Sequence, residues 1–521
     1  MSYLIWFSSH NKYDELKILE LKSLLETFGY YCNISLNGEE LNLKKNKYAG
    51  ETYIKINKLQ GNVSIEDIWK NVLSRSILTK GIVEIWGEGG TYDELLVNLK
   101  TKNDLFESTL NNKKWCFHFH AYGKIINQEE KVKKMDMFNI YVEKYKNIDI
   151  LNPHVQLAIF EEHDKESKGI LNKIYFGKCI ALRKFNPSLI YNKDSNDNTC
   201  ISDKKECDNC NNDININEKK KIENNNRKTW WAHYALNKRR ILGPTTTDNE
   251  LAFIMCNIAK IKKGDIVLDP FVGSGGLLIA SSVFNAICIG NDIDIRLLKG
   301  YKLSYLNPHM KHKSNKKTIF ENFKQYNLNS PEILVSDNSN PVWNFFHKPW
   351  IDAIVTDPPY GNRATVRMSI KIEKPQKTNK IENEHSVDIT NGSISNNYID
   401  ALQNNNSHVE NSEATNNITI SNSVTEPSNN DKLGKVKSLT NTKTVTYSCA
   451  LAVKDLLTIA SKTLVDNGML VFLFPVQFET MEEEMEILKH EDFYLISYGM
   501  QEFTDYSGRL IVAMQRKPRI Y

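Results

Sequence analysis

The sequence has 521 residues, which is long enough for two or three domains with buried cores. Its formal net charge of +4 is mildly basic and is compatible with a polyanionic partner without requiring one. The 9 cysteines are scattered, mostly in apolar runs, which is typical of reduced intracellular proteins and argues against a disulfide scaffold. There is no signal-peptide pattern and no run of about 18 apolar residues, so we expect a cytoplasmic protein without a membrane span.

The first third of the chain mixes strand and helix patterns. Apolar residues alternate in some runs and recur at helical spacing in others. This mixture predicts an α+β module over residues 1–190. The predicted strands are 3–8, 53–56, 82–86, 115–120, 155–160 and 174–177, and the predicted helices are 16–28 and 68–78.

Two histidines stand two residues apart in one of these predicted strands. His118 and His120 therefore share one face of the sheet. A metal pair is one interpretation of this spacing, but a solvated sheet face is the expectation.

Two segments differ sharply in composition from the rest of the chain. Residues 193–228 are rich in Asn, Asp and Lys, and residues from about 371 to 444 are rich in Asn, Ser and Thr. Such segments bury too little apolar surface to fold, so we expect both to be disordered insertions. The first contains Cys200, Cys207 and Cys210, but no fourth ligand is evident and no metal site is predicted.

A basic, aromatic connector precedes the second domain, which we place at residues 229–521. Two tryptophans are followed by Lys238, Arg239 and Arg240. This run either contacts RNA phosphates or is a solvated linker anchored by its tryptophans. The next run of threonines, ending in Asp248, predicts the N-terminal cap of a helix over residues 250–259.

A glycine loop follows the buried strand at residues 265–268. Strand, glycine loop and helix in succession indicate a nucleotide-cofactor site. A dinucleotide fingerprint would need glycine where Leu278 stands, and a P-loop would need lysine after Gly276. An acid at the strand end suits a cationic cofactor better, which favours S-adenosylmethionine. The residues predicted to bind it are Asp269, Phe271, Gly273 and Gly275.

Acids end the following strands of the same domain. Asp292 is the first choice and Asp294 the second for binding ribose hydroxyls, and Asp337 is placed to accept from the adenine amine. Each acid alone is compatible with a helix cap. Their order along successive strands predicts an α/β, Rossmann-like domain with one cofactor site.

The stretch Asp357-Pro358-Pro359-Tyr360 follows an apolar strand at residues 351–355. Two prolines stiffen the backbone and direct its carbonyl groups. The Asp357 carboxylate and the Pro358 carbonyl can accept hydrogen bonds from the exocyclic amine of a base, and Tyr360 can stack on the ring. This is the predicted catalytic stretch, and Arg363 after it is a candidate contact to phosphate or base.

These residues resemble the tRNA (guanine-10-N2)-methyltransferase family, the catalytic subunits of class I S-adenosylmethionine enzymes with an N-terminal THUMP-containing RNA-binding region. The likeness covers nearly all of the chain outside the two insertions. The N-terminal stretches 75–78 and 84–87 are more specific to this family than the Asp-Pro-Pro-Tyr motif is. The other matching stretches are 243–251, 269–275, 292–294, 357–361, 468–474 and 507–510.

The resemblance implies a product, N2-methylguanosine in tRNA, made from S-adenosylmethionine. It also implies a small zinc-containing activator subunit that forms a heterodimer with the methyltransferase domain by completing a sheet edge. The Asn-rich insertion behind Arg363 departs from the family pattern beside the substrate loop.

Two alternatives remain open on the sequence. One is an amino-methyltransferase that acts on another tRNA guanine or on adenine N6 in DNA. The other is a non-catalytic RNA-binding relative, against which the intact Asp269, Gly273, Gly275 and Asp357 argue.

Overall fold

The computed structural model contains two domains, each built around a sheet, within residues 1–369 and 444–521. Residues 370–443 form a second unit, nearly all of which lies outside the described residues, as does the predicted insertion at 193–228 with its three cysteines. The residues that the structure describes are 2–8, 12–30, 35–36, 39–40, 51–57, 65–164, 169–183, 229–300, 304–308, 310, 315–343, 348–359, 367–371, 442–446 and 449–520.

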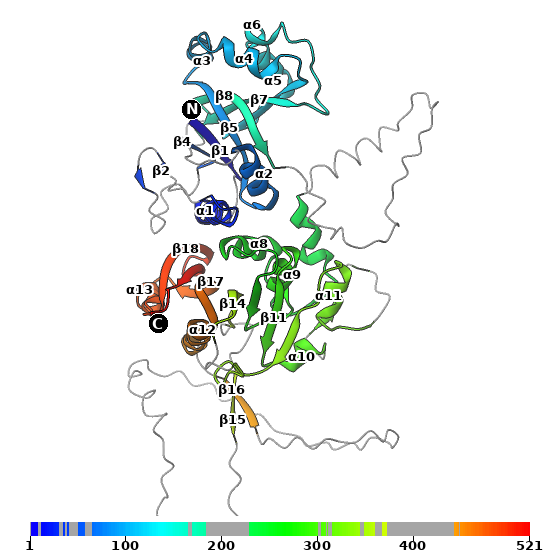
Figure 1. Cartoon of the computed structure of the whole chain (residues 1–521), viewed down its shortest axis with the longest axis vertical. Helices are drawn as coiled ribbons and strands as arrows, with labels where there is room; N and C mark the ends of the chain where they lie inside the picture. The colour runs from blue at the N-terminus through cyan, green and yellow to red at the C-terminus, as the bar shows by residue number, and fades with distance from the viewer. Residues whose placement is uncertain are drawn as a thin grey trace, which may run out of the picture. The chain divides into compact units, whose positions relative to one another are not determined.

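A six-stranded mixed sheet forms the N-terminal domain (Figure 1), in the order β4-β1-β5-β8-β7-β6. Neighbouring strands are antiparallel except for β6 and β7, which are parallel. The strands are β1 (Ser2–Phe7), β4 (Tyr53–Asn57), β5 (Thr79–Gly89), β6 (Trp115–Tyr122), β7 (Val155–His163) and β8 (Leu171–Leu182), with a small separate pair of β2 (Ser35–Leu36) and β3 (Glu39–Glu40). The helices are α1 (Lys17–Thr27), α2 (Ile65–Arg75), α3 (Tyr92–Leu99), α4 (Asn103–Leu110), α5 (Gln128–Asp136) and α6 (Asn139–Val142).

The predicted α+β character of this region is confirmed, with shifted boundaries. The helix expected at 68–78 ends at Arg75, because the backbone from Thr79 onward pairs in the longer strand β5. One face of the sheet packs against the helices through apolar residues such as Ile5 and Leu157.

The other face of the sheet is aromatic, and the expectation of a solvated face at His118 and His120 was wrong. The His120 ring lies 4.5 Å from the ring of Trp6 and 5.8 Å from that of Phe160. Burial lowers the pKa of His118 to about 4 and that of His120 to about 3, so both rings are neutral at pH 7. In the part of the chain that the structure describes, no group of three His, Cys, Asp or Glu side chains is placed to hold a metal ion.

A seven-stranded sheet forms the second domain, in the order β13-β11-β10-β14-β17-β19-β18. Five neighbouring strands run parallel, and the hairpin of β18 and β19 completes one end antiparallel. The strands are β10 (Ile266–Asp269), β11 (Ile287–Asp292), β13 (Glu332–Val335), β14 (Ile351–Thr356), β17 (Leu464–Gln477), β18 (Phe493–Thr504) and β19 (Ser507–Arg516). Short pairs are formed by β9 (Ile241–Leu242) with β12 (Tyr305–Leu306) and by β15 (Arg367–Lys371) with β16 (Thr442–Thr446).

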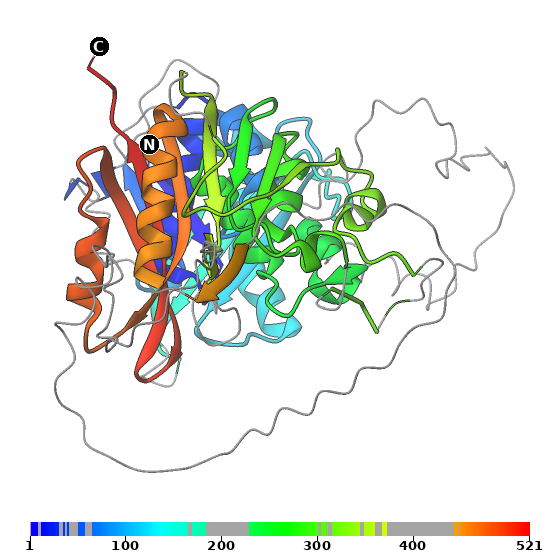
Figure 2. The same ribbon diagram turned by 90° about the horizontal axis from the view of Figure 1, so that it is seen from below.

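Helices cover both faces of this sheet (Figures 1 and 2), as a doubly wound Rossmann-like fold requires. Residues of α8 (Asn249–Ile258) and α9 (Gly276–Val283) share one core with Val267 and Val355, and residues of α12 (Cys449–Thr463) share another with Leu268 and Ile354. Adjacent residues of one strand thus face opposite cores, which explains their continuous apolar runs. The remaining helices are α10 (Ile295–Leu298), α11 (Phe320–Gln325) and α13 (Met481–Glu484).

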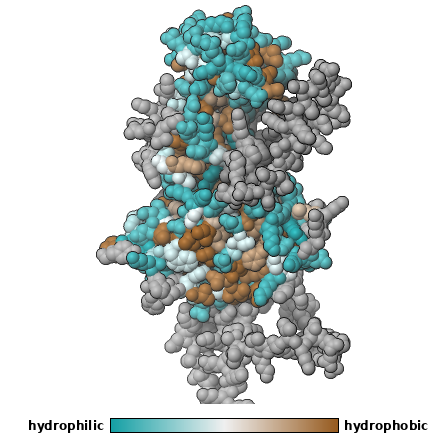
Figure 3. All heavy atoms as spheres, turned by 45° about the vertical axis from the view of Figure 1, so that its right-hand side comes forward, coloured by the Kyte–Doolittle hydropathy of each residue, from teal (hydrophilic) through white to brown (hydrophobic). Residues whose placement is uncertain are grey.

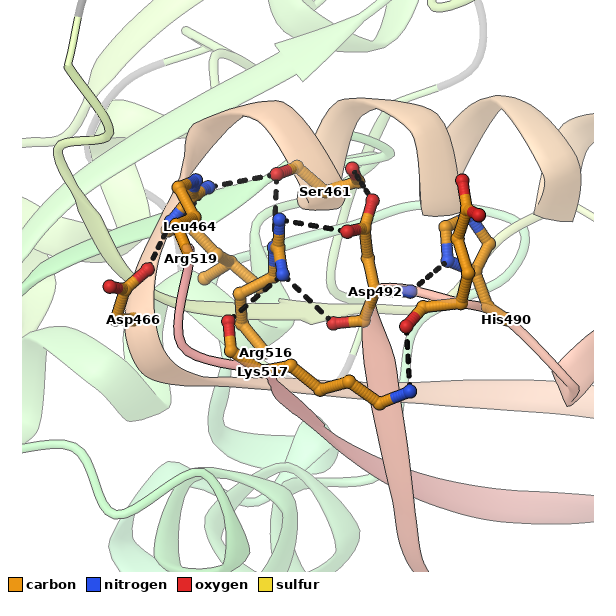
Figure 4. A network of polar contacts seen from close by, with 9 residues as sticks. Ser461, Leu464, Asp466, His490, Asp492, Arg516, Lys517 and Arg519 are labelled. Atoms are coloured by element: carbon orange, nitrogen blue, oxygen red, sulfur yellow. Dashed lines mark hydrogen bonds and ion pairs between the residues drawn. The ribbon is translucent and has the colours of Figure 1, made fainter. Parts of the chain in front are cut away.

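A polar network fastens the C-terminal hairpin to the end of α12 (Figure 4). Arg516 donates to the Ser461 carbonyl at 3.1 Å and pairs with the Asp492 carboxylate at 3.0 Å. Arg519 donates to the same Ser461 carbonyl at 2.9 Å and pairs with Asp466. These arginines satisfy carbonyls at the helix C-terminus, where positive charge is favourable. None of the helices within the described ranges has the length and apolar character needed to cross a membrane.

Candidate active site

Four acids from different stretches of the chain meet at one edge of the second sheet. The parallel strands β13, β11, β10 and β14 are neighbours, so their carboxyl ends lie side by side. Asp292 and Asp269 end β11 and β10, and Asp337 and Asp357 follow β13 and β14. The structure therefore brings together the acids that the sequence placed at separate strand ends, at the edge where open α/β sheets bind ligands.

The glycine loop lies against this edge in a conformation that only glycine adopts readily. Gly273 has φ +49° and Gly275 has φ +78°, both in the left-handed region. The backbone N–H of Gly273 donates to the Asp292 carboxylate at 2.9 Å. A Cβ added at Gly273 would meet nothing closer than the Phe271 carbonyl at 3.9 Å, so the loop leaves room for a ligand.

Asp269 is fully buried beneath this loop. Its carboxylate accepts hydrogen bonds from the Thr356 hydroxyl at 2.6 Å and from the Phe271 N–H at 3.1 Å. Burial raises its pKa to about 7, and the negative charges of Asp292 and Asp357 add to that rise. Burial likewise raises the pKa of Asp292 to about 6. A positive charge beside these two carboxyls would favour their ionised form and so offset the cost of burial. The site therefore fits a cationic cofactor.

The two alternatives for ribose binding differ in their surroundings. Both Asp292 oxygens accept backbone N–H groups, from Gly273 and from Asp294 at 2.8 Å. Asp294 is paired with Arg296, whose guanidinium donates to it at 2.8 and 2.5 Å. Because this pairing neutralises Asp294, Asp292 stays the better candidate. Asp337, the adenine candidate, is mostly buried and accepts from the N–H of Ser339 at 2.9 Å.

A buried chain of amides beside the loop escaped the sequence prediction. The Ser336 hydroxyl donates to the Asn291 side chain at 2.6 Å, and that amide donates to Asn338 at 2.7 Å. Asn338 in turn donates to the Pro270 carbonyl at 2.6 Å. The chain ties the glycine loop to the ends of two strands. Polar residues at the ends of two strands, Asn291 in β11 and Ser336 and Asn338 after β13, were its signal.

Asp357 lies at the end of β14, half-buried, with Pro358 buried behind it. Its carboxylate accepts a hydrogen bond from the Thr247 hydroxyl at 3.0 Å, which fixes the direction of one oxygen. Tyr360 and Arg363 lie outside the described residues, so their roles stay predictions.

The threonines before α8 are functional candidates that sequence reasoning took only for a helix cap. Asp248 alone caps the helix by accepting from Glu250 and Leu251, which leaves the other side chains available. Thr247 binds Asp357, and the Thr246 hydroxyl lies 3.0 Å from that of Ser274 in the glycine loop. Three threonines in a row exceed what a cap needs, and that excess was the available signal.

Of the predicted RNA contacts in the connector, the structure excludes Arg239. Its side chain is 1% exposed, and its Nη1 lies 3.2 Å from where a Cβ on Gly276 would stand. Lys238 is exposed, while Arg240 is half-buried and lies 3.3 Å from Glu321. Trp230 and Trp231 are buried in the core of the second domain, so the connector is anchored by its tryptophans.

Comparison with known proteins matches both domains to family models. Residues 1–184 match the Tmrp11 THUMP N-terminal domain, and residues 237–373 match the RMKL-like methyltransferase domain. With the sheet order and the acidic edge, these matches define the class: the chain is a class I methyltransferase with an N-terminal THUMP domain.

Curated relatives from Mus musculus and Homo sapiens are both named tRNA (guanine(10)-N(2))-methyltransferase TRMT11. The chain is 29% identical to that of Mus musculus over 511 residues, which cover 96% of this chain and 85% of the relative. It is 27% identical to that of Homo sapiens over 96% of this chain and 86% of the relative. The family resemblance predicted from the sequence is thereby confirmed. Among solved structures, the chain aligns with TrmN from Thermus thermophilus at 11% identity and a TM-score of 0.37, covering 99% of this chain and 100% of that one.

Proposed function

We propose that this protein transfers a methyl group from S-adenosylmethionine to the N2 amine of guanine 10 in tRNA, giving N2-methylguanosine. The observation that carries the proposal is the position of Asp357, held by Thr247 at the end of β14 and next to the buried Asp269. The name of the Mus musculus relative, which matches 96% of the chain, supports the choice of substrate.

The cofactor side of the site is built from the carboxyl ends of β10, β11 and β13. S-adenosylmethionine supplies a methyl group already activated on a sulfonium, together with a positively charged amine. Asp269 is placed to compensate the positive charge, and Asp292 to bind ribose hydroxyls. The positive φ of Gly273 and Gly275 shapes the loop, and the N-terminus of α9 offers its N–H groups to the cofactor carboxylate. Phe271 packs partly buried beside the loop, and Asp337 stays the proposed acceptor for the adenine amine.

The substrate side is built from the Asp-Pro-Pro-Tyr stretch. An amine on a heteroaromatic ring is a poor nucleophile because its lone pair is delocalised into the ring. The Asp357 carboxylate and the Pro358 carbonyl accept hydrogen bonds from the two N–H groups of this amine. These bonds localise the lone pair on nitrogen, where it can attack. Asp357 also receives the proton that the amine loses, while Pro359 stiffens the turn and Tyr360 stacks on the flipped base. Positioning of the amine against the methyl group supplies much of the rate.

Binding of tRNA is assigned to the N-terminal THUMP domain, with Lys238 as an additional phosphate contact and Arg363 near the base. A flipped guanine must leave its helix to reach Asp357. We place the reaction in the cytoplasm, in keeping with the free cysteines at Cys116 and Cys256.

The test is methyl transfer from labelled cofactor to unmodified tRNA, followed by nucleoside analysis. We expect N2-methylguanosine at one guanine, and a loss of about 10²- to 10⁴-fold in rate for Asp357→Asn with cofactor affinity unchanged. The Asp505→Asn variant, on the β18–β19 turn, is the matched control and keeps full rate. Methylation of another guanine, or of adenine in DNA, would replace the substrate assignment. Absence of cofactor binding would identify a non-catalytic RNA-binding relative.

We also propose that the small zinc-containing activator subunit binds the free edge at β13. The sheet ends at β13 on one side and at β18 on the other. The β18 edge is partly engaged, because the N–H of Met500 donates to Glu15 at 2.6 Å. Near the β13 edge Leu334, Val335 and Ile287 are exposed, at 37%, 51% and 55%. In Figure 3 apolar surface gathers on the lower part of the face that is drawn.

Co-expression with the activator tests this assignment. Val335→Glu places a charge on the edge and is expected to abolish co-purification of the two chains. Tyr494→Glu places the same charge on exposed β18 and is expected to leave the complex intact. Loss of the complex in the second variant alone would move the activator to the opposite edge.

A further inference from the structure

Helix α1 of the THUMP domain is buried on two sides. Ile18, Leu21 and Leu25 pack in the core of the N-terminal sheet. Leu16, just before the helix, and Leu19 belong instead to the core that contains α8 and α9 of the methyltransferase domain. The two domains therefore share one continuous core through this helix, and the polar groups within it must find partners there.

Glu20, on the same helix, is the centre of a buried polar network. Its carboxylate accepts four hydrogen bonds, from the Ser76 hydroxyl and the Leu78, Ile77 and Asn257 donors, at 2.8, 2.9, 2.9 and 2.8 Å. The first three belong to the segment after α2, and Asn257 belongs to α8. A single carboxylate thus binds both domains.

Arg75, the last residue of α2, reaches across the same boundary. Its Nε donates to the side-chain amide oxygen (Oδ1) of Asn257 at 3.1 Å, and its Nη1 donates to the backbone carbonyl of Ile261 at 2.7 Å. Its guanidinium lies 3.6 Å from the ring centroid of Phe284, which follows α9. Burial lowers the pKa of Arg75 only to about 10, so it stays charged at pH 7. A cation at the C-terminal ends of α8 and α9 is well placed for both helix dipoles.

Helices α8 and α9, which Arg75 contacts near their C-terminal ends, both begin at the catalytic site. The residue Thr247, two before α8, donates to Asp357. Helix α9 begins at Gly276 in the glycine loop. A helix of 10 residues is a rigid rod of about 15 Å, so holding its far end constrains the near end.

We propose that Arg75, Glu20 and Asn257 form a latch that fixes the THUMP domain to the far ends of α8 and α9, and so sets which nucleotide of a bound tRNA meets Asp357. Arg75 is then a positioning residue. The stretch 75–78, which the sequence singled out, serves the domain boundary and not RNA, because Arg75 is only 7% exposed and faces the methyltransferase domain. The proposal rests on the proposed function.

The test compares Arg75→Met, which keeps the apolar stem and removes the donors, with Lys70→Met. Lys70 is a cation on the same helix that is 62% exposed, so its replacement is the matched control. For Arg75→Met we expect cofactor affinity within about twofold of wild type, a fall of about 10- to 100-fold in kcat on tRNA, and methylation spread over neighbouring guanines. Arg75→Lys restores part of the rate, since one donor survives. Asn257→Ala breaks the same network from the other domain and repeats the pattern.

Unchanged rate and position in Arg75→Met and Asn257→Ala would overturn the latch. A fall in kcat that is matched by an equal loss of cofactor affinity would also overturn it, since it would show damage to folding. Hydrogen exchange gives a readout independent of tRNA. Cofactor should slow exchange at the N–H groups of Ile77 and Leu78, which bind Glu20, in wild type and not in Arg75→Met; equal protection in both refutes the latch. If wild type leaves tRNA unmethylated, the proposed function fails while this exchange test still decides on the latch.

Discussion

Replacing Thr356 by valine removes the hydroxyl that donates to the buried Asp269 carboxylate at 2.6 Å while keeping the size of the side chain. That hydrogen bond favours the ionised acid and so opposes the effect of burial, which raises the pKa of Asp269 to about 7. A hydrogen bond to a charged group contributes about 1.5–3 kcal/mol, which corresponds to a pKa change of about 1–2 units. The pKa of Asp269 should therefore rise further in Thr356→Val.

The consequence appears in cofactor affinity, because a cationic ligand prefers the ionised carboxyl. With a pKa of about 7, the ionised fraction grows from about one tenth at pH 6 to about three quarters at pH 7.5, an increase of about eightfold. Affinity for S-adenosylmethionine should increase by a similar factor over this range. In Thr356→Val the rise should begin about 1–2 pH units later, so affinity at pH 7.5 falls by about 3- to 25-fold.

Isothermal titration calorimetry between pH 5.5 and 7.5 measures this effect below the pKa of the ligand's own amine, about 7.7–8.0 for an α-amino group. Thr458→Val is the matched control, since that exposed hydroxyl donates only to the Lys454 carbonyl in α12. An affinity that is flat from pH 6 to 7.5, or that responds identically in both variants, would refute the assignment of Asp269.

The raised pKa of Asp269 also predicts that the cofactor-free protein loses stability as pH rises, whereas cofactor affinity increases. Two further substitutions test the site. Since the folded state raises the pKa of Asp269 above its unfolded value near 4, the contribution of Asp269 to the unfolding free energy should be largest below pH 4 and be lost as pH rises through 7, which thermal melts without ligand measure. Thr247→Val should lower kcat by about tenfold at unchanged cofactor affinity, because the Asp357 carboxylate loses the donor that orients it; an equal change in Kd would contradict this reasoning. Lys238→Ala should weaken tRNA binding and reduce the slope of log affinity against log salt by about 1, whereas Arg239→Met should lower the melting temperature and leave that slope unchanged. If Arg239→Met changed the slope of log affinity against log salt, Arg239 would contact RNA after all.

Several features of the active site were predictable because they depend on local pattern. Apolar runs bounded by glycine and proline mark buried parallel strands, and an acid directly after such a run lies at the carboxyl edge. Asp269, Asp292 and Asp357 follow that rule, and the structure places all three at neighbouring strand ends. Gly273 and Gly275 were predictable for a similar reason, since their loop needs positive φ.

Contacts between distant segments were not predictable in this way. Thr247 and Asp357 are 110 positions apart, and Thr356 and Asp269 are 87 apart, so no periodicity links them. Arg239 resembles its basic neighbours in sequence, yet it alone is buried, because the short helical turns of the connector direct it toward α9. His120 likewise lies on the predicted face, but Trp6 from another strand determines that this face is aromatic.

Local sequence pattern alone thus predicted two kinds of domain, a cofactor loop, and an acid with prolines at the end of a strand. These features depend only on the order of residue types along short segments, because backbone preferences and the spacing of apolar residues act locally. Only the tertiary structure decided which of these groups are buried, which pKa values rise, and that Arg75 binds the methyltransferase domain through Asn257. Burial and partnership depend on segments that are far apart in the chain, and packing alone brings those segments together.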